Sequence, residues 1–326
     1  VSHAPECGAF TQNLQGVCVT SFVKVTTVLA TILVCSTLPV SAAANKAAVS
    51  QTEAETTIIA VGDMACEPHL PCDQQGVADL VDPSKHSALL ALGDLQYHAG
   101  KYSHFIFSYD QVWGEHYGIT YPSPGNHEYI TRGASGYFQY FEPRFKALAK
   151  TTSGSPQKGW YSFKLGSWHV VSLNSNCYVI GCGPNSQQVK WLKNDLRRSK
   201  SACTIAFFHH PRFASGEHGN YSALKHIWTV LQNNKVEVAL AGHDHNYERL
   251  APALSNGKAA RTGVTQFIVG TGGKSLRPMG KPSPLSVVSD NTNYGALELS
   301  LRGNSLDWSF KTTTNGVLDA GSLACF

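Results

Sequence analysis

From residue 57 onward, short apolar runs alternate with amphipathic stretches. Six runs are rich in β-branched and aromatic residues and are bounded by Gly, Pro, Asp or Asn, as buried strands are. These runs read TTIIAV, ALLAL, WHVVSL, TIAFF, VEVAL and TQFIV. Between them, apolar residues recur at helical spacing in residues 186–199 and 222–234, which predicts two amphipathic helices. Strands that alternate with helices predict an α/β domain.

The last third of the chain has a different pattern. Residues 294–316 predict two antiparallel strands joined at a turn through Gly303 and Asn304. There is no internal repeat and no second boundary in the pattern. We therefore predict one domain over residues 57–326.

The first 56 residues do not fit this domain pattern. Residues 25–42 are almost free of charge and are followed by small residues near Ala42, which predicts a secretory signal over residues 1–44. Residues 1–18 lack Lys and Arg, and we interpret them as an over-extended start. An uncleaved anchor is the alternative, but Pro39 and the shortness of the apolar run argue against a membrane span. Residues 45–56 then form a linker, and the protein is predicted to be secreted or extracytoplasmic, without a span after signal cleavage.

The cysteine positions agree with export. Six of the nine cysteines follow the predicted cleavage site, and an even number in an exported chain suggests disulfides. Short spacing favours pairing Cys66 with Cys72 and Cys177 with Cys182. The remaining pair would be Cys203 with Cys325. Buried free thiols are the alternative.

Composition narrows the class of protein further. The chain has 326 residues, of which 42% are hydrophobic, with a formal net charge of +4. This fits a folded globular protein with a sizeable core. Basic residues are scattered among acidic ones, so no nucleic-acid groove is evident.

Polar motifs follow five apolar runs, namely four of the six runs above and the run ITYPSP at residues 119–124. In chain order they read GDMA, GDLQY, GNHEY, HHPRF and AGHDHNYER. Loops at the carboxyl ends of strands are where open α/β sheets build sites. A single Gly-Asp pair is only a common turn, but five such motifs in order predict a metal site. In the last motif, His243 and His245 are two residues apart, so both side chains can point to one face of an extended segment.

The order of these motifs resembles the calcineurin-like metallophosphoesterases and, more closely, the purple acid phosphatases. The resemblance covers residues 57–275. It implies a four-layer α/β/β/α sandwich of two mixed sheets flanked by helices. It also implies a secreted dinuclear-metal phosphoesterase that hydrolyses phosphate monoesters through attack of a metal-activated hydroxide on phosphorus. Two ions close together can clamp the attacking and leaving oxygens of such an ester.

The resemblance also implies the metal ligands, residue by residue. Asp94 would bridge the two ions. The first ion would bind Asp63, Tyr97 and His245, and the second would bind Asn126, His209 and His243.

One motif separates the purple acid phosphatases from other metallophosphoesterases. A D-x-H sequence, whose histidine is a ligand, is absent because Ala65 stands two residues after Asp63. Tyr97 instead follows Asp94 by three residues, where the purple acid phosphatases carry a tyrosinate. A free phenol has a pKa near 10, so a phenolate ligand requires a strongly polarising ion. The cofactor implied is Fe³⁺ plus a divalent metal, which is Fe, Zn or Mn. The alternative is that Tyr97 only packs.

The substrate contacts are also implied by the resemblance. His127 would bind the phosphate or protonate the leaving group, and His218 is a second catalytic and substrate-binding candidate. Asn126 would contact the substrate as well as the metal, and His210 would support the ligands. The other histidines are expected to be ordinary surface or core residues.

Two other functions fit the same residues. One is a phosphodiesterase acting on cyclic nucleotides or phospholipid headgroups. The other is a non-catalytic protein that binds metal or phosphate, although His127 would then have no role as a proton donor. The expected partner is a small phosphate ester, and the sequence does not indicate the oligomeric state.

Overall fold

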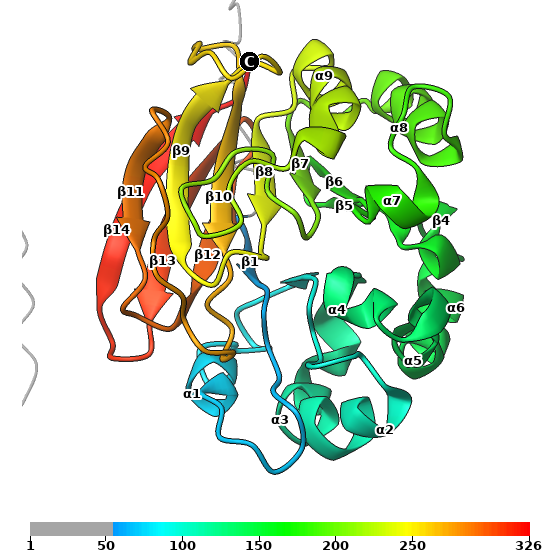
Figure 1. Cartoon of the computed structure of the whole chain (residues 1–326). Coiled ribbons are helices and arrows are strands. Elements are labelled where there is room, and N and C mark those ends of the chain that lie inside the picture. Colours follow the sequence, from blue (N-terminus) through cyan, green and yellow to red (C-terminus); the bar gives the residue numbers. More distant parts are fainter. Residues whose placement is uncertain (1–54) are drawn as a thin grey trace, which may run out of the picture. The chain divides into compact units, whose positions relative to one another are not determined.

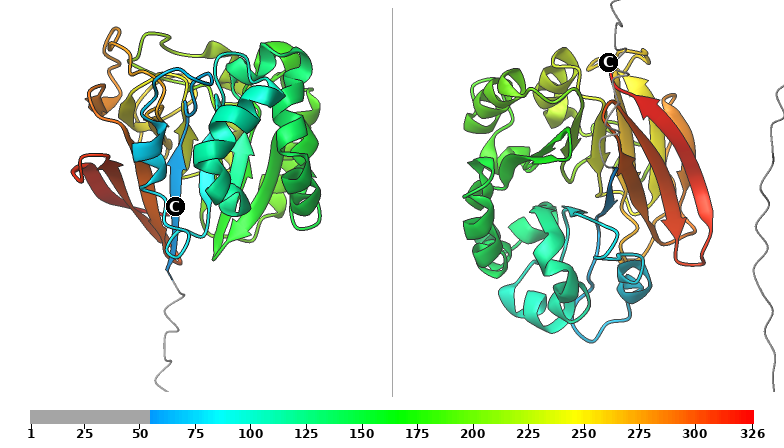
Figure 2. Two further views of the ribbon diagram at one scale, coloured as in Figure 1. Left: turned by 90° about the horizontal axis from the view of Figure 1, so that it is seen from below. Right: turned by 180° about the vertical axis from the view of Figure 1, so that it is seen from behind.

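Two mixed β-sheets form the body of the protein in a computed structural model, which describes residues 55–326 (Figures 1 and 2). Helices flank the sheets, as the predicted α/β sandwich requires. The predicted signal and residues 45–54 of the predicted linker lie outside the described residues. Thr56, which the sequence prediction assigned to the linker, already lies in the first strand.

The first sheet has six strands. Strands β1, β2 and β3 form a parallel half that ends at the edge strand β3, and β12, β13 and β14 continue the sheet in antiparallel fashion. The predicted turn at Gly303 and Asn304 joins β12 to β13. In spatial order the strands are β14 (Val317–Ala324), β13 (Ser305–Thr312), β12 (Gly295–Leu301), β1 (Thr56–Val61), β2 (Leu89–Leu92) and β3 (Thr120–Ser123).

The second sheet has eight strands. Strands β6, β7, β8 and β10 are parallel, and the outer strands are antiparallel to their neighbours. The six strands predicted from the apolar runs all occur, with small shifts at their ends. In spatial order the strands are β11 (Ser286–Asp290), β9 (Tyr247–Ala253), β10 (Val264–Val269), β8 (Val238–Ala241), β7 (Thr204–Phe207), β6 (Trp168–Ser172), β5 (Trp160–Leu165) and β4 (Ser153–Ser155).

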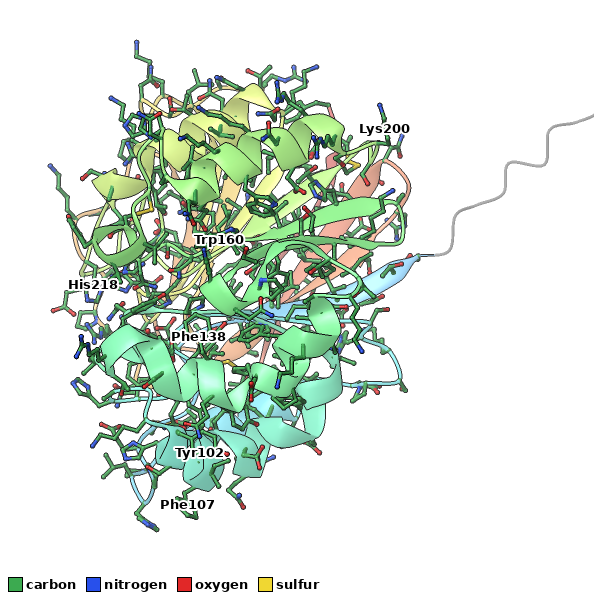
Figure 3. The ribbon with its side chains drawn as sticks, turned by 90° about the vertical axis from the view of Figure 1, so that its right-hand side faces the viewer. Tyr102, Phe107, Phe138, Trp160, Lys200 and His218 are labelled. Atoms are coloured by element: carbon green, nitrogen blue, oxygen red, sulfur yellow. A yellow bond between two sulfur atoms is a disulfide. The ribbon has the colours of Figure 1, made fainter. Side chains whose placement is uncertain are left out.

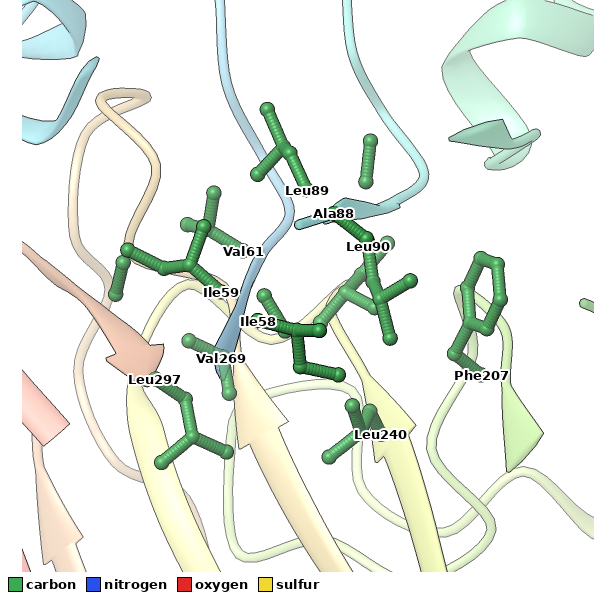
Figure 4. Close-up of a cluster of buried hydrophobic side chains, with 14 of the residues drawn as sticks. Ile58, Ile59, Val61, Ala88, Leu89, Leu90, Phe207, Leu240, Val269 and Leu297 are labelled. Carbon is green, nitrogen blue, oxygen red and sulfur yellow. The ribbon is translucent and has the colours of Figure 1, made fainter. Parts of the chain in front are cut away.

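The main core lies between the two sheets. Figure 4 shows apolar side chains from both of them in one cluster, including Ile58, Leu90, Phe207 and Leu240. Successive side chains of a strand point to opposite faces, so Ala206 faces a second core with Val171, under the helices. Because both faces of these strands are buried, their sequences are continuous apolar runs rather than alternating ones.

Two predicted helices cover the second core at the upper right of Figure 1. They are α8 (Gln187–Arg198), whose predicted cap Ser186 accepts a hydrogen bond from the Val189 N–H at 3.3 Å, and α9 (Lys225–Asn233). The remaining helices are short, and a π or 3₁₀ turn follows α2, α3 and α4. They are α1 (Gln74–Ala78), α2 (Tyr102–His104), α3 (Asp110–Trp113), α4 (Asn126–Tyr129), α5 (Ser135–Tyr140), α6 (Glu142–Leu148) and α7 (Cys177–Ile180).

Three disulfides join the six cysteines in the predicted pairs. Cys66 is bonded to Cys72, and Cys177 to Cys182. The third bond joins Cys203 and Cys325 across 122 residues. It connects the start of β7 in one sheet to the end of β14 in the other, so it ties the two sheets together.

None of the helices in the described part of the chain combines the length and the apolar character needed to cross a bilayer.

Candidate metal centre

The five polar motifs meet at one edge of the sandwich because each follows the carboxyl end of a strand. Asp63 follows β1, Asp94 follows β2, and Asn126 follows β3. His209 and His243 follow β7 and β8 in the other sheet. The two sheets therefore contribute ligands to a single site where their carboxyl edges face each other.

Three of these residues have a left-handed backbone. The φ angles are 59° at Asp63, 50° at Asp94 and 74° at His243. Such a conformation is unfavourable for residues other than glycine and persists where the surrounding structure enforces it. It turns each side chain sharply out of its strand and into the site.

One set of atoms surrounds the Tyr97 hydroxyl. That hydroxyl lies 2.7 Å from Asp63 Oδ1, 2.9 Å from His245 Nε2 and 3.1 Å from Asp94 Oδ2. His245 Nε2 is also 3.4 Å from Asp63 Oδ1. The structure thus brings together the whole ligand set expected for the first ion, and these four atoms could share one cation.

A second set surrounds His209 Nε2. Asn126 Oδ1 lies 3.0 Å from this nitrogen, His243 Nδ1 lies 3.1 Å from it, and Asp94 Oδ2 lies 3.2 Å from it. These are the residues expected for the second ion. Asp94 Oδ2 therefore contacts both sets, which is the position that a bridging carboxylate must occupy.

The orientation of two imidazoles is fixed from behind. His209 Nδ1 is 3.0 Å from the Leu92 carbonyl oxygen, and His245 Nδ1 is 2.7 Å from that of Ser275. A backbone carbonyl accepts from an N–H, so each ring presents the lone pair of Nε2 to the site when it is neutral. Histidines that bind metals are held by such bonds in general.

Charge and burial also fit a cation. Asp63, Asp94 and His209 are fully or almost fully buried, and their ligand atoms lie within 4.8 Å of one another. Burial raises the pKa of Asp63 to about 7 and lowers that of His245 to about 4. Although burial opposes charge on both partners, the attraction between Asp94 and His209 raises the pKa of His209 to about 9. Adjacent buried carboxylates and imidazole nitrogens are the oxygen and nitrogen donors that borderline metal ions prefer.

Tyr97 lies beside the loop in which Ala65 replaces the histidine of a D-x-H motif, and its backbone N–H donates to the Ala65 carbonyl at 2.8 Å. The backbones at Ala65 and Gln96 are bridged, so the loops after β1 and β2 run side by side. Burial raises the pKa of the Tyr97 phenol well above its ordinary value, and Asp63 and Asp94 add to this effect. A phenolate therefore requires a strong cation at this position.

His127 lies at the rim of the cluster. Its backbone N–H donates to Asp94 Oδ1 at 2.8 Å, and its Nδ1 bonds the carbonyl of His98. Its Nε2 then faces the cluster, 3.8 Å from Asp94 Oδ2. Burial lowers the pKa of His127, and the Asp94 carboxylate partly opposes this shift. His98 was expected to be an ordinary residue, but its carbonyl orients His127.

His218 lies on another side of the site and is visible at the edge of Figure 3. Its Nδ1 is 2.9 Å from the buried carboxylate of Asp244, and its Nε2 is 3.1 Å from Arg277 Nη1. Its ring centroid is 4.3 Å from that of His243. Sequence reasoning located His218 but missed Asp244 and Arg277, although Asp244 stands between the two histidines of the last motif.

Glu128 is a further residue that sequence reasoning missed. Its buried carboxylate accepts hydrogen bonds from the backbone N–H groups of Asp94 at 3.0 Å, Leu95 at 2.9 Å, Gln96 at 3.2 Å and Gly125 at 2.7 Å. It joins the loop after β2 to the loop after β3. The signal was its place in the GNHE motif, directly after two candidate site residues.

His210 belongs to the same surroundings. Its ring centroid lies 4.5 Å from that of His243, and its Nδ1 is 2.8 Å from Ser175 Oγ. Burial lowers its pKa well below the ordinary value. It packs behind the second ligand set and connects it to the surface next to Tyr221.

A sequence profile of the calcineurin-like phosphoesterases matches residues 56–247. The chain belongs to this family. It is 27% identical over 270 residues to "Fe(3+)-Zn(2+) purple acid phosphatase 12" of Arabidopsis thaliana, which covers 73% of this chain and 56% of that protein. It is 29% identical to "Probable inactive purple acid phosphatase 9" of the same plant over 38% of this chain and 20% of that protein.

A solved structure agrees with the family. The purple acid phosphatase PPD1 from yellow lupin seeds superposes with a TM-score of 0.67 at 18% identity, covering 84% of this chain and 54% of that chain. This likeness confirms the predicted fold. The chain spans only about half the length of the first of these curated relatives and of the lupin protein. The resemblance to the purple acid phosphatases is confirmed.

The close packing around Asp94 predicts that adding one methyl group at Gly125 will disturb metal binding. A Cβ added at Gly125 would lie 2.1 Å from Asp94 Oδ1, so Gly125→Ala must displace the Asp94 carboxylate. We expect the purified variant to lose bound metal while remaining folded, as measured by elemental analysis and circular dichroism. The control is Gly118→Ala, because a Cβ there meets nothing within 4 Å. A folded Gly125→Ala variant with the metal content of the control would contradict the packing argument.

Proposed function

We propose that this protein is a secreted, dinuclear-metal phosphoesterase that hydrolyses phosphate monoesters. The observation that carries the proposal is the position of Asp94 Oδ2, within 3.2 Å of both His209 Nε2 and the Tyr97 hydroxyl. Membership of the calcineurin-like phosphoesterases supports metal-dependent phosphoester hydrolysis. The three disulfides support an extracytoplasmic location.

The residues fit a pair of bound metals. Asp63, Tyr97 and His245 would hold an Fe³⁺ ion, because a buried phenol between two carboxylates ionises only beside a strongly polarising cation. Asn126, His209 and His243 would hold a divalent ion, which is Fe, Zn or Mn. The printed name of the Arabidopsis relative, an Fe(3+)-Zn(2+) phosphatase, supports this pairing. When bound, such a pair polarises phosphate oxygens and supplies a nucleophile from water.

His127 would move a proton in the proposed reaction. Its Nδ1 is engaged with the His98 carbonyl, so Nε2 is the nitrogen that can reach the substrate. As the bond between phosphorus and the leaving oxygen breaks, Nε2 of the protonated ring would donate its proton to that oxygen. Burial lowers the pKa of His127, and nearby cations would lower it further, so this donor is lost as the pH rises through an acidic range.

His218 and Asn126 would position the phosphate group. Asp244 holds the Nδ1 side of His218, and Arg277 lies at its Nε2 side, so the Arg277 guanidinium could bind a phosphate oxygen at this rim. Asn126 belongs to the second ligand set and is half-buried, so its amide could contact the substrate beside the metal. A monoester dianion would match the charge of two bound cations and Arg277 better than a diester monoanion would.

A panel of p-nitrophenyl mono- and diesters, run on metal-analysed protein, tests the proposed function. We expect the phosphate monoester to be hydrolysed with the higher kcat/KM, and treatment with a chelator to abolish the activity. A higher kcat/KM for the diesters would contradict the monoester assignment and indicate a phosphodiesterase. Metal-loaded protein that binds phosphate without hydrolysing any ester would contradict the proposal and support a binding protein.

The role of His127 predicts a dependence on the leaving group. His127→Ala should lower kcat by about 10²–10⁴-fold for alkyl phosphates at acidic pH. The loss should be smaller for p-nitrophenyl phosphate, because its leaving group departs without protonation. The metal content should stay near that of the wild type, since His127 contributes only its backbone N–H to Asp94.

His226→Ala is the control for the loss of a histidine, because His226 is exposed on α9, outside the site. If His127→Ala slowed both substrates equally, His127 would act by binding phosphate alone, and the leaving group would take its proton from His218 or from water.

A further inference from the structure

A shallow pocket with an aromatic wall opens next to the second ligand set. It has a volume of about 250 Å³, and Asn126 and His210 form its inner end. Its outer wall consists of Ile130, Tyr178, Val179 and Tyr221, which we call the aromatic ledge. No side chain that lines this pocket in the described structure carries a fixed charge.

Three of the four side chains of the aromatic ledge are large and apolar but exposed to solvent, so they contribute little to the core. The exposed fractions are 88% for Tyr178, 61% for Val179 and 52% for Ile130. These three are among nine large hydrophobic residues that are exposed in residues 55–326, and they line one pocket. Apolar side chains gathered at a concave site mark a place where a ligand binds.

A covalent constraint holds the ledge in position. Tyr178 and Val179 belong to the short helix α7, which lies inside the loop closed by the Cys177–Cys182 disulfide. None of the residues of this helix is buried. The disulfide therefore fixes two apolar side chains at the surface without anchoring them in the core.

An unbroken series of rings connects the ledge to the metal centre. The centroid of the His210 ring lies 4.5 Å from that of His243 and 4.5 Å from that of Tyr221, on which it stacks. Tyr221 meets the Tyr178 ring edge-on at 6.1 Å. At the inner end, Asn126 Oδ1 is 3.0 Å from His209 Nε2. A molecule that reaches the second ligand set can therefore lie against the ledge.

We propose that the aromatic ledge binds the organic group of the substrate, and that this group is a planar, uncharged aromatic alcohol. The proposal rests on the proposed phosphoesterase function, because a monoester has one organic group and that group is the leaving group. A cavity of about 150 Å³ holds benzene, so the pocket has room for one or two rings. The charged groups Lys274 and Arg277 lie beside Tyr97 and His218 instead, so a second phosphate would find no partner on the ledge.

The test compares two esters whose leaving alcohols have similar pKa values, phenyl phosphate and a fluorinated alkyl phosphate. We expect wild-type protein to prefer phenyl phosphate. Tyr178→Ala should lower the ratio of kcat/KM for phenyl phosphate to that for the alkyl ester by about three- to tenfold, the range for one aromatic contact. Tyr178→Phe should keep the wild-type ratio, because the ring remains.

Phe107→Ala is the matched control. Phe107 is 67% exposed, and Figure 3 shows it at the bottom of the molecule, away from His218. Its loss should leave the ratio unchanged. If both esters are hydrolysed and the ratio of kcat/KM is the same in the wild type and Tyr178→Ala, the ledge does not bind the organic group. The proposed phosphoesterase function would be unaffected by that result.

A binding measurement tests the role of the ledge independently of whether the protein hydrolyses esters. Calorimetry of the metal-loaded protein with phenylphosphonate and methylphosphonate, which are not hydrolysed, should show tighter binding of phenylphosphonate and loss of that preference in Tyr178→Ala. If no ester is hydrolysed but phenylphosphonate still binds more tightly than methylphosphonate, the proposed catalytic function is wrong and the proposed binding role of the ledge is supported. If the two phosphonates bind equally, or if Tyr178→Ala converts a dimer into a monomer in light scattering, the ledge does not bind the substrate.

Discussion

The site depends on a single buried carboxylate. Asp94 Oδ2 lies within hydrogen-bonding distance of groups from both ligand sets, and Oδ1 accepts the His127 N–H. Asp94 is 1% exposed, and a buried carboxylate without compensating positive charge is unfavourable. Two cations in contact with it would satisfy that requirement. The rest of the architecture can be understood as holding this carboxylate between two sets of ligands.

The two-sheet sandwich provides the rigid frame for this arrangement. Parallel strands from both sheets end at the same edge, and the main core between them fixes how far apart the ligand loops lie. Three candidate ligands adopt left-handed backbone conformations, and such conformations cost about 1–3 kcal/mol each. Glu128 stabilises the loops after β2 and β3 by accepting hydrogen bonds from four backbone N–H groups. The frame and these backbone contacts therefore hold the candidate ligands in position.

The sequence predicted the strands that precede the polar motifs, and the clustering of the candidate ligands, because both depend on local patterns. Runs such as TIAFF are apolar since both faces of β7 are buried, and the polar motif after each run lies at the carboxyl edge by necessity. The short helices between residues 102 and 148 escaped prediction. Their aromatic residues follow no single helical period, because π and 3₁₀ turns interrupt the α-helices.

Supporting residues escaped prediction for a different reason. Glu128 acts on backbone N–H groups more than 30 residues away, and Arg277 meets His218 across 59 residues. Such contacts leave no periodicity in the sequence. The aromatic ledge escaped prediction for the same reason. The exposure of Tyr178 follows from the position of α7 next to the pocket, and the residues before and after Tyr178 in the sequence do not indicate it.

The most direct test of the bridging role of Asp94 is anomalous X-ray diffraction from crystals of the metal-loaded protein, measured at the absorption edges of iron, zinc and manganese. The account predicts two peaks about 3.5–4 Å apart, both at ligand distance from Asp94. The peak beside Asp63, Tyr97 and His245 should be iron, and the peak beside Asn126, His209 and His243 should be the divalent metal. A single peak, or two peaks of which one is out of reach of Asp94, would contradict the account.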